Sequence, residues 1–299
     1  MTRSEPGSGP TAGASPIYYD GQRMHIRPVT TLEDCRRVAA LEKIVWGLSD
    51  AEDVVPPILL IVSIRRGGIL LGAFDDVGEM QGFVYSMAGL KDGRPMQWSH
   101  MLGVAPTARD SGLGTRLKLA QREAAIALGL ELIEWTFDPL QALNAHFNFA
   151  KLGVVVDEYE QNVYGESSSP LHRGAPTDRF VAAWRITTAH VERRIASMNR
   201  PMVRDARVMA APVVNPSSVV EQRLAPGVAD LSCDEPRLLV EIPTDYDKTL
   251  VRDPALALEW RLSTRAIFEA YFARGYRAVD FLLSRSAGRG QYLLALPSP

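Results

Sequence analysis

The chain has 299 residues, 46% hydrophobic and 23% charged, so it can bury a sizeable core without metal or disulfide staples. Its 33 basic and 35 acidic side chains give a net charge of −2, which excludes a protein whose main role is to wrap nucleic acid. The two cysteines, Cys35 and Cys233, are far apart and lack neighbouring histidines, which excludes a disulfide framework or zinc site and favours the cytoplasm.

Residues 1–20 are rich in Gly, Ser and Pro and have no apolar core behind their arginine, so we expect a mobile tail and no secretory signal. The longest apolar stretch, residues 54–64, is interrupted by two prolines and falls short of the ~20 residues that span a bilayer. We therefore expect no membrane partner.

From residue 24 onward, the pattern predicts alternating strands and helices. A short strand at 24–27 precedes an amphipathic helix over 32–45, which a capping pair, Thr31 and Asp34, opens. The elements expected next are a helix at 57–64, strands at 69–74, 82–88 and 97–104, a helix at 113–128, a strand at 132–137, a helix at 140–152, and strands at 154–163 and 179–186. This order predicts a three-layer α/β fold with mixed strand directions.

After residue 200 the apolar stretches are short and are broken by prolines and small polar residues. We therefore place a domain boundary near 195–205. The domains are then 21–198 and a smaller α+β domain at 199–299. In the second domain we expect a helix at 254–273 and strands at 238–242, 276–283 and 291–296. The segment FARGYRAVD (272–280) echoes FAKLGVVVD (149–157), which suggests a degenerate half-repeat; chance recurrence of helix, glycine and strand is the alternative.

The most informative segment is RDSGLG (109–114), which puts two glycines where a strand turns into a helix. Backbone N–H groups at the positive end of a helix bind a pyrophosphate, and glycine allows its close approach. Arg109 can add a charge-assisted contact. The segment lacks Gly-Lys-Ser/Thr and follows several strands, which argues against a nucleotide-triphosphate loop and a dinucleotide fingerprint.

This segment resembles the motif Arg/Gln-x-x-Gly-x-Gly/Ala of the GNAT superfamily of N-acetyltransferases, which holds the pyrophosphate of acyl-coenzyme A. TFDPLQALNAHFNFAKLGVVV (136–156) looks like the second coenzyme-A motif of the family, ending in Lys-x-Gly. With WSHMLGV and LHRGAPTDRF, these segments are similar to a bacterial branch of predicted acetyltransferases with a C-terminal extension. The resemblance implies a GNAT-like three-layer fold with a mixed, splayed central sheet.

The resemblance also implies an acyl-CoA-dependent N-acyltransferase that needs no metal. Such an enzyme moves an acetyl or succinyl-type group from coenzyme A to the amine of a small molecule or amino acid by direct attack. The alternatives are a non-catalytic acyl-CoA sensor or scaffold, and a thioesterase or other specialised-metabolism enzyme on the same fold. We expect the C-terminal segment to cover the acceptor site or to form a homodimer contact; simple core extension is the alternative.

The coenzyme-A contacts that the resemblance implies come from the strand end, the glycine turn and the second motif. They are Leu102, Val104, Arg109, Asp110, Ser111, Gly112, Leu113, Gly114, Thr115, Asn144, Phe149 and Lys151. Arg116 and Lys118 follow the glycines and are expected to reach the ribose phosphate, although exposed basic residues on any helix look the same.

Acyl transfer to an amine needs a base, donors for the oxyanion and a proton source for the thiolate. His100, expected on the same strand face as Leu102, and Glu134 are the base candidates; a structural imidazole and an ion-paired carboxylate are the alternatives. Many members of the family have a tyrosine at the position of Phe149, and this tyrosine donates the proton. Tyr159 or Tyr164 can substitute for it, or the thiolate leaves without enzymatic protonation.

For the acceptor, His172 and Arg179 lie in or beside the long loop 167–178, where specificity residues are common. The guanidinium of Arg179 can bind both oxygens of a substrate carboxylate. A salt bridge to Asp178 or to a neighbouring carboxylate is an equally good interpretation of this arginine.

Overall fold

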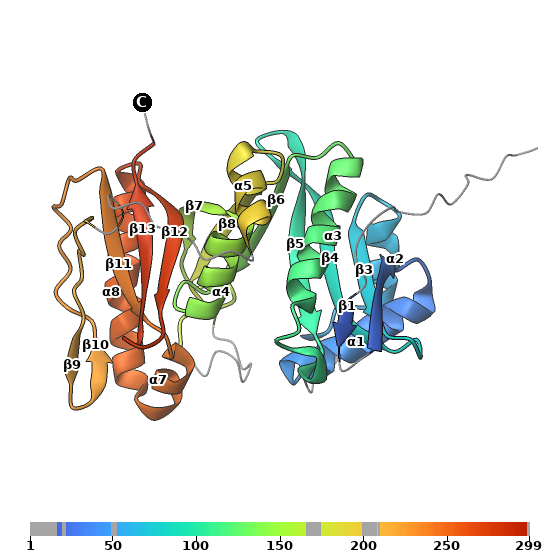
Figure 1. Cartoon of the computed structure of the whole chain (residues 1–299), viewed down its shortest axis with the longest axis horizontal. Helices are drawn as coiled ribbons and strands as arrows, with labels where there is room; N and C mark the ends of the chain where they lie inside the picture. The colour runs from blue at the N-terminus through green and yellow to red at the C-terminus, as the bar shows by residue number, and fades with distance from the viewer. Residues whose placement is uncertain are drawn as a thin grey trace, which may run out of the picture.

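A computed structural model describes residues 17–19, 22–48, 53–165, 175–198, 208 and 210–297. An 11-stranded sheet runs through the molecule in the order β1-β2-β3-β4-β5-β6-β8-β7-β12-β13-β11 (Figure 1). Its strands are β1 (Ile17–Tyr19), β2 (Gln22–Pro28), β3 (Ile69–Phe74), β4 (Met80–Lys91), β5 (Arg94–Val104), β6 (Leu132–Phe137), β7 (Val155–Glu160), β8 (Arg179–Arg185), β11 (Arg237–Pro243), β12 (Arg277–Ser284) and β13 (Arg289–Ala295). Among the strand pairs of the described residues, β5–β6 alone is parallel, and β9 (Ser218–Val220) and β10 (Arg223–Ala225) form a separate hairpin.

The helices are α1 (Leu32–Trp46), α2 (Pro57–Ile64), α3 (Leu113–Ala127), α4 (Ala142–His146) with a π-helical continuation (Phe147–Leu152), α5 (Ala189–Ser197), α7 (Tyr246–Arg252) and α8 (Pro254–Ala273). The helices expected near 32–45, 57–64, 113–128 and 254–273 are present, the one expected at 140–152 is partly π-helical, and α5 and α7 were not predicted. The Thr31 side chain accepts a hydrogen bond from the Asp34 amide at 3.1 Å and so caps α1. Gly153, at a φ of 74°, ends the π-helical segment in the left-handed conformation.

Two neighbouring residues of β4 show that helices cover both faces of the sheet. Phe83 packs edge-on against Trp46 of α1, with ring centroids 6.0 Å apart. A Cβ on Gly82 would lie 3.1 Å from Leu117 of α3. Because successive residues of a strand point to opposite faces, α1 and α3 lie on opposite sides. The predicted three-layer α/β arrangement is confirmed.

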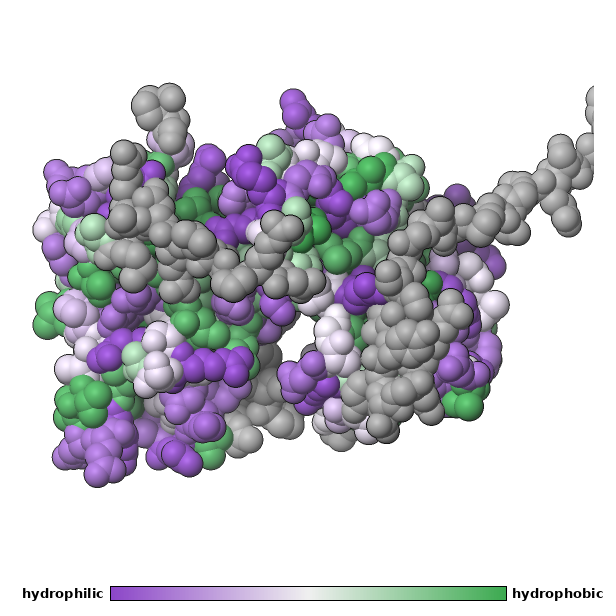
Figure 2. Space-filling view, in the orientation of Figure 1, coloured by the Kyte–Doolittle hydropathy of each residue, from purple (hydrophilic) through white to green (hydrophobic). Residues whose placement is uncertain are grey.

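The sheet opens between β5 and β6. These strands pair only at Gln97↔Ile133 and Trp98↔Glu134, and beyond these two pairs they diverge. Figure 2 shows a gap between the two halves of the molecule in this region. The predicted splay is therefore confirmed, and it leaves one edge of β5 without a strand partner after Trp98.

A β-bulge lies directly beyond the last β5–β6 pair. Tyr85 of β4 pairs with Met101 and Ser86 pairs with Ser99, so His100 is an extra residue on β5. A bulge locally changes the face on which side chains emerge. It thus determines where His100 points.

The C-terminal segment extends the same sheet. In the C-terminal segment, β11 is followed along the chain by α8, β12 and β13, just as β6 is followed by α4, β7 and β8 in the first part. In each set, the strand that is last in sequence lies between the other two in the sheet. The two sets meet at Val156↔Ala278, within the two segments that echo each other. The strand order agrees with a half-repeat, although a duplication remains a prediction.

The C-terminal segment also shares an aromatic core with the first part of the chain. The ring of Phe180 on β8 lies 4.6 Å from that of Phe268 and 5.3 Å from that of Tyr292. The expected boundary near 195–205 falls largely on residues 199–207, outside the described chain. A division at residue 199 into two folding units stays a prediction.

The expectation of a mobile tail over residues 1–20 does not hold for Ile17–Tyr19. This segment pairs with β2 as β1, with Ile17 opposite Met24. The run consists of one β-branched and two aromatic residues, which favour a strand although the neighbouring segment is rich in Gly and Pro. Among the described helices, none has the length and apolarity to cross a membrane.

Candidate functional site

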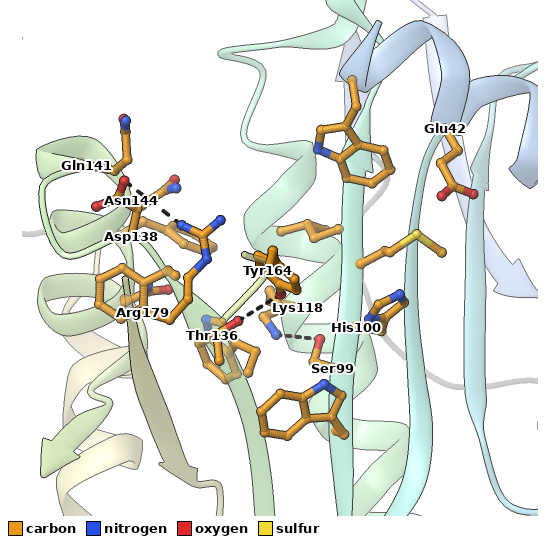
Figure 3. A pocket seen from close by; sticks show the side chains of 18 of the residues that line it. Glu42, Ser99, His100, Lys118, Thr136, Asp138, Gln141, Asn144, Tyr164 and Arg179 are labelled. Atoms are coloured by element: carbon orange, nitrogen blue, oxygen red, sulfur yellow. Dashed lines mark hydrogen bonds and ion pairs between the residues drawn. The ribbon is translucent and has the colours of Figure 1, made fainter. Parts of the chain in front are cut away.

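A cavity of about 620 Å³ lies where β5 and β6 diverge (Figure 3). Its walls come from α1, β5, α3, β6, α4, β8 and α7, elements far apart in sequence. Figure 3 shows Asp138, Gln141, Asn144 and Arg179 on one side of the cavity and Glu42 and His100 on the other. The bulge and the splay thus place polar side chains around a single space.

The N-terminus of α3 presents free backbone donors. The first amides of a helix have no intrahelical acceptor. The Leu113 amide donates to Ser111 Oγ at 3.3 Å, and the Arg116 amide donates to the Gly112 carbonyl at 3.2 Å. Among the described residues, the Gly114 and Thr115 amides find no acceptor. With the positive end of the helix dipole, these two donors can bind an anion.

The turn before α3 depends on left-handed backbone. Gly112 has a φ of 81° and Asp110 a φ of 61°. A Cβ on Gly112 would meet nothing within 4 Å, so it is the left-handed backbone alone that strains any other residue at this position. Glycine suits this position because of its φ, and the direction of the missing Cβ is open for a ligand.

The anion site and the cavity are connected along β5. The side chains of Leu102 and Val104 would lie 3.9 and 3.8 Å from a Cβ on Gly114, so both face α3. Leu102 also lines the cavity. The edge of β5 that faces β6 has no strand partner from Ser99 to Val104, so its backbone groups are available to a ligand.

His100 lies on the face of β5 opposite to Leu102, which corrects the expectation that the two share a face. Its ring packs edge-on against Tyr85, with centroids 6.2 Å apart, because the bulge reverses the alternation. The ring is exposed at the cavity wall. The protein around its other sides lowers its pKa below the usual value, because burial disfavours the charged form.

Glu42 of α1 is a cavity residue that the sequence analysis missed. Its side chain is 3% exposed and accepts a hydrogen bond from the Val55 amide at 3.2 Å. Burial raises the pKa of this carboxyl to about 7, although the Val55 amide lowers it in part. The available signal was its position on the apolar stripe of α1 with Cys35 and Val38.

Lys118 is buried, 3% exposed, and cannot reach a ribose phosphate outside the helix as expected. Its Nζ donates to Ser99 Oγ and Gln121 Oε1, both at 3.0 Å, and lies 3.7 Å from the centroid of Trp135. Burial lowers the pKa of this amine to about 7. Lys118 lines the cavity from the α3 side.

Glu134 does not line the cavity. Its carboxylate lies 3.7 Å from Lys91 Nζ, and Lys91 also donates to Glu158 at 3.0 Å. Burial raises the pKa of Glu134 and Lys91 opposes this rise. The arrangement is that of the ion-paired carboxylate, the alternative interpretation of Glu134.

The cavity also excludes Tyr159, Phe149 and Lys151. The Tyr159 hydroxyl donates to Asp178 Oδ2 at 2.6 Å, and burial followed by this carboxylate raises its pKa far above 10. Phe149 is fully buried, with its ring 5.6 Å from that of Tyr292. Of the two tyrosines proposed as acids, only Tyr164 lies at the cavity.

Tyr164, Arg179 and Asn144 line the cavity together. The Tyr164 hydroxyl lies 3.4 Å from Thr136 Oγ1, and the Arg179 guanidinium lies 5.1 Å from the Tyr164 ring centroid. Arg179 Nη1 is 3.9 Å from Asp138. Asp178 pairs with Arg265 instead. His172 lies outside the described residues.

The C-terminal segment contributes directly to the cavity wall. Asp247 of α7 lines the cavity and accepts a hydrogen bond from Gln141 Nε2 at 2.5 Å. Arg261 of α8, 1% exposed, holds the cavity residue Asp138 by two hydrogen bonds. Neither contribution was predicted from sequence, because both depend on contacts between residues more than 100 positions apart.

Acidic side chains outnumber basic ones in the lining of the cavity. The acidic lining residues are Glu42, Asp53, Asp138 and Asp247. The basic ones are Lys118 and Arg179. The described residues contain no group of three or more His, Cys, Asp or Glu side chains that could hold a metal ion.

No protein-family model matches the sequence, and a comparison with curated proteins finds no match. Solved structures match part of the chain. An acetyltransferase of the GNAT family from Streptococcus pneumoniae is 20% identical, with 54% of this chain and 98% of that chain covered and a TM-score of 0.44. The ribosomal-protein-S18-alanine N-acetyltransferase of Escherichia coli is 15% identical, with coverage of 56% and 96% and a TM-score of 0.45. An aminoglycoside acetyltransferase from an uncultured soil metagenomic sample is 15% identical, with coverage of 42% and 84% and a TM-score of 0.37.

Proposed function

We propose that this protein is an acyl-CoA-dependent N-acyltransferase that transfers an acyl group to the amine of a small molecule or amino acid. One observation carries the proposal. The free amides of Gly114 and Thr115 at the start of α3 connect, along Leu102 and Val104, to a polar cavity at the splay of β5 and β6. This is an anion site joined to a reaction chamber.

The dimensions of this path fit coenzyme A. The pantetheine arm of coenzyme A has twelve bonds between its ester oxygen and its sulfur. Four residues of extended backbone contain the same number of bonds, so the arm spans about 13–14 Å. Gly114 lies opposite Leu102 and Val104 of β5, and the four residues of strand from the residue between them, Gly103, to Ser99 span about 13 Å. A diphosphate on the α3 amides would therefore deliver its thioester to the bulge at His100.

The groups at this point suit acyl transfer. The unpaired edge of β5 offers backbone N–H groups to the amides of the arm and to the oxyanion that develops on the carbonyl. His100, whose pKa is lowered, is neutral at neutral pH and can accept the proton of the attacking amine. It faces the side of the sheet opposite to the cofactor path, where an acceptor can enter.

The charge of the cavity supports an amine as acceptor. Acidic side chains such as Asp53 and Asp247 attract a cation and raise its local concentration. Arg179 would bind a carboxylate if the acceptor is an amino acid. Its position near Asp138 would then set the distance between the amine and carboxylate that the cavity accepts.

A thiol-release assay tests the proposal. Acetyl-, propionyl- and succinyl-CoA are each incubated with the protein and a panel of amines and amino acids. Amine-dependent release of coenzyme A is the expected result. Binding of coenzyme A without thiol release with any acceptor would support the sensor or scaffold, and release without an amine would support a thioesterase.

A further inference from the structure

The acid of the proposed reaction is missing from its expected position. The family motif often supplies a tyrosine where this chain has Phe149, and Phe149 is fully buried outside the cavity. Tyr159 is committed to Asp178. If the enzyme protonates the departing thiolate, the proton comes from Tyr164 or from another group that lines the cavity.

We propose that Lys118 is the general acid that protonates the thiolate of coenzyme A as it leaves; this inference rests on the proposed function. The acceptor nitrogen attacks the thioester carbonyl, so that a C–N bond forms and the C–S bond breaks, with its electron pair going to sulfur. The Lys118 ammonium gives one proton to this sulfur and becomes a neutral amine. The proton that the acceptor nitrogen loses restores the ammonium through solvent in the cavity, and the net change is one amide and one thiol.

The position of Lys118 along the cofactor path favours this role. Its Nζ is held by Ser99 Oγ, and Ser99 directly follows the last residue of β5 that pairs with β6. The arm of coenzyme A, anchored at Gly114, spans about 13–14 Å and therefore ends near Ser99, which is about 13 Å along the strand. Lys118 thus lies on the α3 side of the sulfur, and His100 lies on the opposite side, where the acceptor enters.

The surroundings of Lys118 leave its charge uncompensated. Ser99 of β5, Gln121 of α3, Trp135 of β6 and Trp184 of β8 surround the Nζ, and none of these side chains is titratable. The faces of the two indoles attract a cation, which keeps the ammonium form accessible without a carboxylate. With a pKa of about 7, Lys118 is partly protonated and partly neutral at neutral pH. An acid that gives up its proton and regains it in each turnover needs both forms.

The fixed hydrogen bonds also give Lys118 a defined direction. Gln121 Nε2 donates to Ser99 Oγ at 3.1 Å, so these two side chains hold one another whether or not the lysine is present. Lys118→Met keeps the length and the apolar stem of the side chain and removes only the ammonium. The fold should therefore tolerate this change.

The test uses coenzyme A itself and needs no acceptor. The thiol of bound coenzyme A is titrated by its thiolate absorbance, with desulfo-coenzyme A as the background, in wild type, Lys118→Met and Lys43→Met. Lys43 is exposed on α1 and serves as the matched control. Lys118 carries its proton only up to about pH 7, which is below the usual pKa of a thiol. Because a nearby ammonium stabilises a thiolate, we expect the thiolate fraction of bound coenzyme A at pH 7 to be about fivefold larger in wild type than in Lys118→Met. We expect Lys43→Met to match wild type.

The outcomes separate the inference from the proposed function. Failure of wild type to bind coenzyme A overturns both. Equal thiolate fractions at pH 7 in wild type and Lys118→Met, with coenzyme A bound to each, overturn only the role of Lys118. Acylation of Lys118 itself by acetyl-CoA, seen by peptide mass spectrometry, also overturns it, because the amine would then be an acceptor and not an acid.

Discussion

Arg261 donates to both carboxylate oxygens of Asp138, at 2.8 and 2.6 Å, although the two residues are 123 positions apart. Asp138 follows β6 and also accepts the Leu140 amide at 2.8 Å, so its position defines the turn into α4. Arg261 comes from α8, in the C-terminal segment. The C-terminal segment thus holds one wall of the cavity in place.

Removing Arg261 should destabilise the whole protein. Arg261→Met leaves the Asp138 carboxylate without its main partner, and breaking a buried pair from one side costs about 3–5 kcal/mol. Urea unfolding should show this loss. As the control, Arg223→Met breaks the exposed pair with Asp253 and should cost less than about 1 kcal/mol. Equal losses in the two variants would mean that the Asp138 pair adds little to stability.

The order of elements was predictable because local signals agree with it. The Thr31 cap, the prolines before α2 and the left-handed Gly153 each mark a helix end that the structure contains. The glycine turn before α3 was predictable for the same reason. Its chemistry depends on consecutive residues, so sequence spacing captures it.

The cavity was less predictable because its residues depend on pairing and on distant contacts. The bulge at His100 is an offset between β4 and β5 that no local pattern records, and it reverses the predicted face. A lysine in the first turns of a helix is expected to be exposed, although the spacing of Lys118 from Leu117 and Gln121 places it near the buried stripe of α3. Asp138 gained its partner from a helix more than 100 positions away.

The position of the cofactor site can be tested at Gly114. A Cβ there makes only ordinary contacts, 3.8 Å from Val104 at the closest, so both Gly114→Ala and Gly114→Asp should fold. An aspartate in a first turn even favours the helix dipole, but its carboxylate would repel a diphosphate on the Gly114 and Thr115 amides. We expect calorimetry to show at least a tenfold loss of coenzyme A affinity in Gly114→Asp and a smaller loss in Gly114→Ala. Unchanged affinity in the aspartate variant would place the cofactor elsewhere.

Glu42 should make stability depend on pH. Its pKa in the folded protein is about 7, above the reference value of 4.5, so the folded state holds this proton more tightly than the unfolded state. The resulting stabilisation is present below pH 4.5 and is lost as the pH rises through 7. Glu42→Gln keeps an acceptor for the Val55 amide and cannot ionise.

The advantage of Glu42→Gln over wild type should therefore grow between pH 4 and pH 8 by on the order of 3 kcal/mol in the free energy of unfolding. Denaturant titrations at several pH values measure this difference. Glu33→Gln, at an exposed position of the same helix, should differ from wild type by less than about 0.5 kcal/mol. A constant difference for Glu42→Gln across this range would show that the carboxyl is not perturbed.

Asp247 connects the C-terminal segment to the acceptor. Its carboxylate lines the cavity and accepts the Gln141 hydrogen bond, which an asparagine oxygen can still accept. Asp247→Asn therefore removes charge with little change of shape. For a cationic acceptor we expect the acceptor KM to rise about fivefold, equivalent to roughly 1 kcal/mol, because the group is partly in solvent.

The binding of coenzyme A should stay at the wild-type value in Asp247→Asn, since the α3 amides lie outside the part of the cavity that α7 lines. Steady-state kinetics with the amine that gives the fastest thiol release, together with calorimetry of coenzyme A, separate the two effects. Asp245→Asn, an exposed carboxylate two residues earlier and outside the cavity, is the control. A matching rise of KM in both variants would indicate general electrostatic attraction, and no rise in either would remove α7 from the acceptor site.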